Sequence, residues 1–361
     1  MKDIHIRPMR AEEKRDVSAI MRRSFELTQQ LFFSWSSNVL VAEQEGDLRG
    51  AVVLKMFPLP RGRKGGLIAW IFTAPEARGT GAGQRLTEAA LKFFEEQGCD
   101  ELMACVEGYN TSSSKLFATR GFSILSPGEQ FRRYGLGTLA LWMHTFHYID
   151  IGHFLWVRPA ASQSDNPAMQ WWGSWLVNVL IYLLALWRQN DFGLLSLLTV
   201  VKISLLLAMF LGIRTLSMQW MAHRQKMVTM RYRAWESGFP LSLLIALAFG
   251  GQYPVPGSFY PTSDRWRYRD LLPKLGPVAL AGVLPPLILT WGAWALSRLG
   301  GLTPEVSHWV NSALAMGQIL TLFDVVLVFF PFVSFNGRRI WDWNKLIWAG
   351  VALATVALFF V

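Results

Sequence analysis

Hydrophobic and polar positions divide the chain into two parts with different patterns. Between residues 4 and 148, short apolar runs of strand length alternate with segments in which apolar positions recur every three to four residues. From about residue 171 onward, long apolar runs are separated by short polar and basic segments. The first pattern is typical of a soluble domain of strands and helices, and the second is typical of membrane-spanning helices.

Within the first part, strand-like and helix-like segments alternate. VAEQEGDLRGAVVLKM, residues 41–56, has an acidic, glycine-containing turn between two apolar runs, which predicts a hairpin. The predicted order is strand 4–8, helix 11–30, strands within 39–57, strand 66–74, helix 83–98, strand 101–106, helix 110–121 and strand-like segments 121–125 and 138–146. We therefore expect one α/β domain, residues 1–148, with a mixed sheet and flanking helices.

Residues 149–170 are predicted to be a linker, with the polar stretch ASQSDNPA at its centre. The remaining residues, 171–361, are predicted to be an all-α membrane domain that crosses the bilayer several times. Its apolar runs are 172–187, 192–213, 239–250, 277–297, 309–333 and 346–361. All except 239–250 approach the roughly 20 residues that cross a hydrocarbon core.

Charge placement decides how the short run 239–250 is interpreted. If it crossed fully, the basic segments 214–233 and 265–274 would lie on opposite faces, against the positive-inside tendency. If the chain returns through residues 251–260, these segments and a third, 338–345, share one face. We therefore expect five full spans and a hairpin at 239–260. The basic loops and the N-terminal domain are expected in the cytoplasm, and the C-terminus outside the inner (cytoplasmic) membrane.

Composition agrees with a membrane part and excludes some functions. The chain is 52% hydrophobic, contains 17 Trp and carries a formal net charge of +10. The basic excess lies beside apolar runs, so it indicates cytoplasmic loops rather than a nucleic-acid-binding patch. Cys99 and Cys105, six apart, fit neither a disulfide framework nor a metal spacing, and we expect buried free thiols. The charged first 30 residues lack the apolar core of a cleaved signal peptide.

A glycine cluster carries the clearest chemical signal. EARGTGAGQRL, residues 76–86, follows a predicted strand and opens a predicted helix. Backbone amides at such a helix start can bind a pyrophosphate because glycines let the anion approach. The residues concerned are Arg78, Gly79, Thr80, Gly81, Ala82 and Gly83. A purely structural turn remains an alternative, whereas a dinucleotide-binding fold does not fit because the glycines lack GxGxxG spacing.

Residues 4–147 resemble the GNAT family of N-acetyltransferases. Arg78, Gly81 and Gly83 match the family's acyl-CoA signature, (Q/R)xxGx(G/A), and NTSSSKLFATRGF, beginning at Asn110, resembles its downstream helix. The resemblance implies acetyl-CoA or another acyl-CoA as donor, with its pyrophosphate on the amides of residues 79–83. It also implies that strand 68–73, which includes Phe72, meets the thioester carbonyl and that Asn110 contacts the pantetheine side.

The chemistry implied by the resemblance is direct attack of an amine on the thioester, with a base for the ammonium proton and an acid for the thiolate. Phe117 occupies the position where many members have a proton-donating Tyr. Tyr109 or water is then the candidate acid, or the domain binds acyl-CoA without efficient transfer. Glu107 is the first candidate base and Glu43 the second, and each could equally be a solvated loop charge.

Residues 172–361 resemble the site-2 protease family of intramembrane metalloproteases. Residues 229–261 are similar to the segment after that family's metal-binding helix, and FFPFVSFNGRRIWDWNKLIW, residues 329–348, is similar to its Asp-Gly-containing helix. Aligned on these segments, HExxH becomes Gln219–His223, in which only the second His is kept, and the third ligand becomes Asn336. We expect a protease-like fold without zinc and without protease chemistry.

Polar residues left in the apolar runs are costly in lipid unless they face a partner or a water-filled pocket. They are candidates for a substrate-binding cavity, with ordinary interior hydrogen bonds as the alternative: Gln219, His223, Asp324 and Asn336. No metal site is expected from a second group, which lacks ligand spacing: His144, His147, Asp150 and His153.

Three functions are compatible with these features. The first is a membrane-anchored N-acyltransferase whose acceptor is the amine of a membrane lipid or a membrane-associated peptide. The second is an acyl-CoA-sensing membrane protein without transfer, which Phe117 favours. The third is an unconventional intramembrane metalloprotease, against which the lost ligands argue.

Overall fold

The computed structural model of the chain describes residues 4–160, 166–191, 193, 195–227, 230–262 and 266–360. The chain divides into two compact units. The first comprises Met1–His147 and His153–Asp165, and the second comprises Tyr148–Gly152 and Asn166–Val361. Arg265 and most of the polar stretch 161–168 lie outside the described residues.

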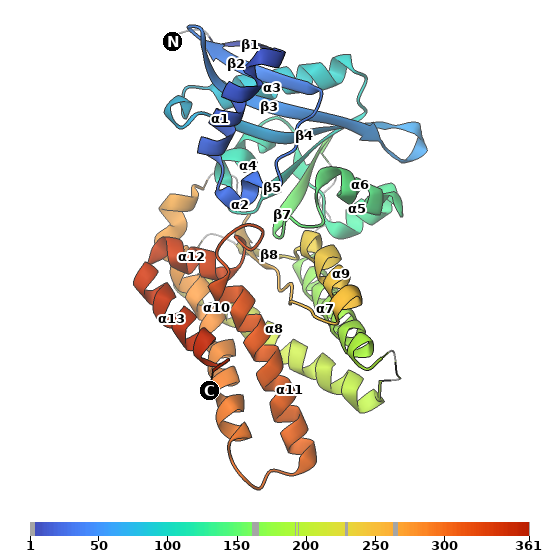
Figure 1. Cartoon of the computed structure of the whole chain (residues 1–361), viewed down its shortest axis with the longest axis vertical. Helices are drawn as coiled ribbons and strands as arrows, with labels where there is room; N and C mark the ends of the chain where they lie inside the picture. The colour runs from blue at the N-terminus through green and yellow to red at the C-terminus, as the bar shows by residue number, and fades with distance from the viewer. Residues whose placement is uncertain are drawn as a thin grey trace. The chain divides into compact units, whose positions relative to one another are not determined.

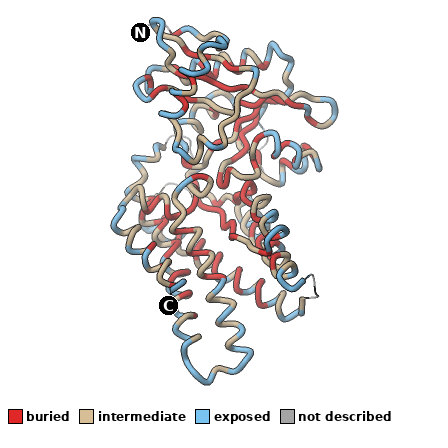
Figure 2. The backbone as a smooth tube through the Cα atoms, viewed as in Figure 1, coloured by how far each residue is buried: buried red, intermediate tan, exposed pale blue. Residues whose placement is uncertain are grey.

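The first unit is built on a seven-stranded mixed sheet of order β1-β2-β3-β4-β5-β7-β6 (Figure 1). All neighbouring strands are antiparallel except β4 and β5, which are parallel. Its strands are the most continuously buried part of this unit (Figure 2). The strands are β1 (His5–Pro8), β2 (Asn38–Gln44), β3 (Asp47–Pro58), β4 (Lys64–Thr73), β5 (Glu101–Glu107), β6 (Ser123–Ile124) and β7 (His153–Arg158).

Helices flank this sheet, which confirms the predicted α/β class. One side of α1 buries Val17, Ile20 and Met21 against strand residues such as Val53. The amphipathic α3 packs on β2, β3 and β4. The helices of the unit are α1 (Lys14–Ser24), α2 (Leu27–Gln30), α3 (Ala82–Glu96), α4 (Thr111–Ala118), α5 (Pro127–Tyr134) and α6 (Gly137–Thr145), with short 3-10 turns η1 (Ala11–Glu13), η2 (Pro60–Gly62) and η3 (Pro75–Ala77).

The prediction of a strand at 138–146 is wrong, because this segment forms helix α6. Its buried positions are Thr138, Leu141, Trp142 and Thr145, which follow the helical period. The outward face is also apolar, with Leu136, Leu139 and Met143 exposed. A helix that is apolar on both faces loses the polar–apolar period that would have identified it.

The predicted linker 149–170 also differs from the structure. It contains β7, which pairs along β5 from Leu102↔Arg158 to Glu107↔His153. The first unit therefore extends beyond residue 148, to Asp165. HFLWVR is a short strand whose residues are mostly buried. It was not predicted from the sequence because histidines, Pro and Ser lie next to it and are not typical of strands.

The second unit is mainly helical, as predicted. Four of its helical segments are long and apolar enough to cross a membrane: Pro167–Gln189, Leu197–Arg224, Tyr268–Ser297 and Pro304–Val326. The last expected span, 346–361, is represented by the shorter apolar helix α13, so four segments rather than five reach spanning length among the described residues. The helices are α7 (Pro167–Gln189), α8 (Leu197–Arg224), α9 (Phe239–Phe249), α10 (Tyr268–Ser297), α11 (Pro304–Thr321), α12 (Asn336–Trp343) and α13 (Lys345–Ala357).

The two ends of the segment 239–260 are adjacent in the structure. Before it lies β8 (Met230–Arg233) and after it lies β9 (Ser258–Pro261), and these strands pair antiparallel with Arg233 opposite Ser258. The chain between them forms a 3-10 turn, η4 (Glu236–Gly238), the 11-residue α9 and an extended return. Because both ends meet in one ladder, this segment is a hairpin of the expected kind. The side of the membrane on which its ends lie stays a prediction.

Candidate acyl-CoA site and the altered metalloprotease-like core

The parallel strands β4 and β5 pair over only part of their length. Pairing runs from Gly65↔Glu101 to Ile68↔Ala104 and then ends. Beyond that point β4 continues to Thr73 beside β3, and β5 continues to Glu107 beside β7. The two strands therefore diverge after Ile68 and Ala104, and each has one edge that the other does not pair.

A β-bulge in β4 coincides with this divergence. Leu54 of β3 pairs with Ile68, whereas the preceding residue, Val53, pairs with Trp70. Ala69 is thus an extra residue in β4, and such a residue bends its strand and increases the local twist. We call the opening between Ala69–Thr73 and Cys105–Glu107 the β4–β5 cleft. Backbone N–H and C=O groups on its edges can bind an extended ligand in the manner of an added strand.

The glycine loop connects the far end of β4 to α3. Gly79 and Gly81 have positive φ angles of 82° and 94°, which L side chains rarely adopt. The first helical hydrogen bond runs from Arg85 N to Gly81 O, so the amides of residues 81–84 have no partner within the helix. A Cβ on Gly81 would meet nothing within 4 Å, so there is open space beside this helix start. This is the arrangement that a helix start uses to hold a phosphate group.

Other predicted binding residues divide between the loop and the protein core. Arg78 and Thr80 are exposed in the loop, whereas Ala82 is buried at the start of α3. Phe72 directs its ring into the cluster packed on α1, so only its backbone can contribute to the cleft. Asn110 caps α4, where its Oδ1 accepts a hydrogen bond from Ser113 N at 3.2 Å.

The candidate bases lie in different parts of the sheet. Glu107 ends β5 at the mouth of the cleft, and its Oε2 accepts a hydrogen bond from Tyr109 N at 2.8 Å. Glu43 lies on β2, three strands from β5, where its Oε2 accepts from Arg7 Nε at 2.7 Å. The Arg7 ion pair engages Glu43 away from the cleft, so we retain Glu107 alone as candidate base. Tyr109 is buried in the turn that follows β5.

Phe117 occupies the position where the GNAT resemblance implies a tyrosine, and its side chain packs in the protein core. Phe117 is buried on α4, and its ring lies 5.3 Å from that of Phe122 in an edge-to-face arrangement. Phe117 has no proton to give, and its neighbour has none either. Any proton for the departing thiolate must therefore come from another group or from water.

Lys55 was not predicted from the sequence but lies near the start of the cleft. It pairs across β3 and β4 with Leu67, and its Nζ donates to Ser34 Oγ at 2.9 Å. Its ammonium also lies 4.7 Å from the centre of the Phe146 ring. Burial lowers the pKa of Lys55, because the charged form is less well solvated there.

Residues 5–122 match the acetyltransferase (GNAT) family model. This match covers β1 to α4 and therefore both walls of the cleft and the glycine loop. Residues 5–122 form a GNAT domain. The resemblance seen in the sequence is confirmed for this part of the chain.

Two curated relatives, one named as an acetyltransferase and one named as a metalloprotease, match parts of the chain. It is 33% identical over 95 residues to a mycothiol acetyltransferase of Thermobispora bispora, which covers 26% of this chain and 32% of that protein. It is 29% identical over 128 residues to a protein of Methanocaldococcus jannaschii named as a zinc metalloprotease, which covers 35% of this chain and 61% of that protein. The chain thus spans less than two thirds of either relative, and its activity as a whole is a matter for proposal.

Among solved structures, the N-acetylglutamate synthase of Neisseria gonorrhoeae, with coenzyme A and N-acetyl-glutamate bound, matches with 21% identity and a TM-score of 0.33. That match covers 44% of this chain and 35% of the synthase. The Naa50 protein of Arabidopsis thaliana, with a bisubstrate analogue, matches with 14% identity and a TM-score of 0.32, over 43% of this chain and 97% of that one.

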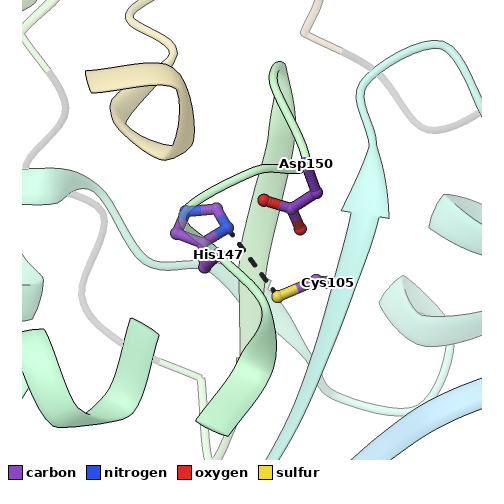
Figure 3. Close-up of side chains that lie close together, drawn as sticks. All are labelled: Cys105, His147 and Asp150. Atoms are coloured by element: carbon purple, nitrogen blue, oxygen red, sulfur yellow. Dashed lines mark hydrogen bonds between the residues drawn. The ribbon is translucent and has the colours of Figure 1, made fainter. Parts of the chain in front are cut away.

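A thiol and an imidazole meet beside the GNAT cleft, and the sequence analysis did not pair them. Cys105 Sγ on β5 lies 3.8 Å from Nδ1 of His147 (Figure 3). Cys105 is only partly buried, as is Cys99, so the expectation of two buried thiols is wrong. Asp150, labelled in the same view, belongs to the segment 148–152 of the second unit, where its carbonyl accepts from Ser237 Oγ at 3.0 Å.

In the second unit, the four candidate cavity residues do not form one site. Gln219 and His223 are exposed on α8, whereas Asp324 and Asn336 are buried together. Asn336 donates to Asp324 from its backbone N at 3.1 Å and from Nδ2 at 2.9 Å. The prediction of a shared cavity lined by all four residues is therefore wrong, and the alternative of interior hydrogen bonds holds for two of them.

The central partner of Asp324 is Arg214, which the sequence analysis had counted with a cytoplasmic basic loop. Both side chains are buried, and they form a bidentate ion pair with distances of 2.8 and 3.0 Å. The third donor of Arg214 reaches Gly257 O at 3.0 Å. An arginine directly after the apolar run 192–213 was the signal that could have identified this pair, because a helix that continues past the run places it in a span, where such residues are rare and usually have partners.

The side of α8 that faces Asn336 does not carry Gln219 and His223. Met218 and Ala222, four residues apart, are buried, and Met218 Sδ lies 3.7 Å from Asn336 Nδ2. These two positions share the buried side of α8, because residues i and i+4 of a helix lie on one side, whereas Gln219 and His223 are exposed. Neither the thioether nor the methyl group resembles the His, Cys and carboxylate ligands of zinc sites.

Proposed function

We propose that the chain is a membrane-anchored acyl-CoA-dependent N-acyltransferase. The observation that carries this proposal is the continuity of β4: the strand opens away from β5 at a bulge and leads directly into a positive-φ glycine loop with open helix-start amides. One strand can thus hold both ends of an acyl-CoA, with the pyrophosphate at α3 and the pantetheine arm along the cleft edge. The GNAT match over the same residues supports this assignment.

The proposed reaction is acyl transfer to an amine. The amine nitrogen attacks the thioester carbon, and amides on the open β4 edge stabilise the developing oxyanion. Glu107 takes the proton from the ammonium because its carboxylate ends β5 at the mouth of the cleft. Arg78 adds a positive charge beside the phosphates.

The acceptor is proposed to be the amine of a membrane lipid or of a membrane-associated peptide. Four segments of spanning length support membrane attachment of the domain. Attachment raises the effective concentration of acceptors in the adjacent leaflet without any new contact. The basic segments 214–233, 265–274 and 338–345 favour a cytoplasmic placement of the GNAT domain at the inner membrane, and no feature suggests a nucleic-acid partner.

A second candidate function is acyl-CoA sensing without transfer. The specific observation in its favour is the buried Phe117–Phe122 pair at the position where many GNAT proteins have a proton donor. Intramembrane proteolysis has the support of one relative's name, but Met218, Ala222 and Asn336 are the side chains that meet in the corresponding core. Zinc is accordingly not part of the proposal.

One experiment separates transfer from sensing. The purified full-length protein in lipid nanodiscs would be given radiolabelled acetyl-CoA with and without a membrane extract. An acyltransferase releases CoA and labels an acceptor when the extract is added. A sensor binds acetyl-CoA in both samples, and neither CoA release nor labelling rises with the extract.

Glu107→Gln should lower kcat by about a hundredfold to ten-thousandfold, because it removes the proposed base. Glutamine still offers an oxygen to Tyr109 N, so the turn after β5 and the KM for acyl-CoA should be retained. Steady-state kinetics with the acceptor found in the labelling experiment measure both values. Glu43→Gln should leave kcat nearly unchanged, and a Glu107→Gln enzyme with wild-type kcat would exclude Glu107 as the base.

A further inference from the structure

We propose that Cys105 and His147 form a nucleophilic pair in which the acyl group of acyl-CoA is transferred to Cys105 Sγ before it reaches the amine. This inference rests on the proposed acyltransferase function and replaces its single direct attack with two steps. None of the relatives' names assigns a role to either residue. The argument depends on where Cys105 lies in the cleft and on how His147 is held.

Cys105 lies at the apex of the β4–β5 cleft. It is the first residue of β5 beyond the last pair with β4, and Ala69 is the first such residue of β4. Both side chains pack against the same hydrophobic cluster, which includes Leu67 and Met103, so they lie on one face of the sheet. Glu107, two residues further along β5, lies on this face as well, because alternate residues of a strand share a face.

His147 is fixed beside this thiol by the helical hairpin of α5 and α6. Its backbone N donates to Trp142 O at 2.9 Å, and its ring meets the Trp142 ring edge-to-face. Trp142 is itself held, because its Nε1 donates to Gln130 Oε1 at 2.6 Å. The imidazole is fully buried, whereas Cys105 keeps some exposure. The nitrogen that can accept the thiol proton is therefore positioned next to a partly exposed cysteine.

The reaction balances without any further reagent. Cys105 Sγ transfers its proton to His147 and forms a bond to the acyl carbon, and the bond between that carbon and the CoA sulfur breaks. His147 then returns the proton to the CoA thiolate. In the second step the amine attacks the acyl–Cys105 thioester, the bond between the acyl carbon and Cys105 Sγ breaks, and Glu107 accepts the proton of the nitrogen. Glu107 then releases this proton through water to the Cys105 thiolate. His147 thus supplies the proton that Phe117 cannot.

The chain provides its own control, because it contains two cysteines. Full-length protein in nanodiscs would be mixed with acetyl-CoA in the absence of any acceptor and analysed by intact-protein and peptide mass spectrometry. We expect one acetyl group on Cys105, removable by hydroxylamine as a thioester. The label should persist in Cys99→Ala and be absent in Cys105→Ala and Cys105→Ser. His147→Gln should slow labelling by at least about tenfold.

Other outcomes would overturn the proposal. Equal labelling of both cysteines would indicate non-specific acetylation, and full acceptor acylation by Cys105→Ser would show direct transfer. Zinc that is bound by the wild type and lost in Cys105→Ala would assign the thiol to a metal instead. Equilibrium binding of acetyl-CoA, measured on every variant, reports on folding. If the wild type itself did not bind acetyl-CoA, the acyltransferase proposal would fail before this one was reached.

Discussion

Gly81→Asp should weaken acyl-CoA binding by about tenfold to a hundredfold, or roughly 1.5 to 3 kcal/mol. The new carboxylate would stand in the open space before the α3 amides, where the pyrophosphate is expected, and like charges at such distances repel. Binding would be measured by isothermal titration of the full-length protein in nanodiscs. The loss should shrink as ionic strength rises, because screening weakens repulsion between exposed charges.

Two matched variants separate charge from backbone strain. Gly81→Asn has nearly the same shape as the aspartate and tolerates positive φ similarly, but it carries no charge. Gly98→Asp places the same carboxylate at another exposed, positive-φ glycine with open space, φ 67°, at the far end of α3. Both should bind acyl-CoA more tightly than Gly81→Asp. If all three variants bound equally well, the pyrophosphate would not lie at this helix start.

Arg214→Leu should destabilise the second unit by about 3 to 5 kcal/mol, because it leaves the buried carboxylate of Asp324 without its cation. The loss should appear as a lower unfolding midpoint of the full-length protein in detergent micelles. The remaining donors to Asp324 come from Asn336, which is neutral and cannot replace the guanidinium.

The double variant Arg214→Leu/Asp324→Leu should recover much of this loss, since no charge is then left buried. His223→Ala, at an exposed position of the same helix, should change stability by less than about 0.5 kcal/mol. If the double variant were no more stable than Arg214→Leu, the ion pair would contribute more to stability than the neutralisation of the two buried charges. A large effect of His223→Ala would contradict its outward placement.

The glycine loop and the start of α3 could be predicted from the sequence because their signals are local. The glycines at 79 and 81 are required by backbone conformation, and a helix start follows within a few residues. The cleft itself depends on the register of β3 and β4, which is difficult to predict from residue types. For example, no residue in GLIAWIFTA indicates that Ala69 forms a bulge. The same limit hid the Cys105–His147 pair, whose members are 42 residues apart and meet only when β5 and α6 are in place.

The membrane half shows a different limit. Four of the five expected spans correspond to long apolar helices, which the length of the apolar runs indicated, and the chain reverses direction within 239–260, as the distribution of basic residues suggested. Helix orientation did not follow, because a helix that is apolar all round gives no polar side to orient it. The sequence therefore did not show that Gln219 and His223 lie on the exposed side of α8, and Arg214 was assigned to a loop although its partner Asp324 was already noted as unusual.

Under the proposed function, attachment through the second unit would restrict the acceptors to the membrane. Its core joins helices through Arg214, Asp324 and Asn336, and the close approach of α12 requires Gly337, where a Cβ would lie 2.1 Å from Val325 O. These residues hold the core of the second unit together. The chemistry that we propose lies in the first unit.

The most direct test of the central claim is comparative mass spectrometry of lipids and membrane peptides from cells that produce either the wild type or Gly81→Asp at equal levels. The account predicts at least one amine-bearing lipid or peptide that is acylated with the wild type and unmodified with the variant. Identical acylation in both cells, with acyl-CoA binding lost in the purified variant, would contradict it.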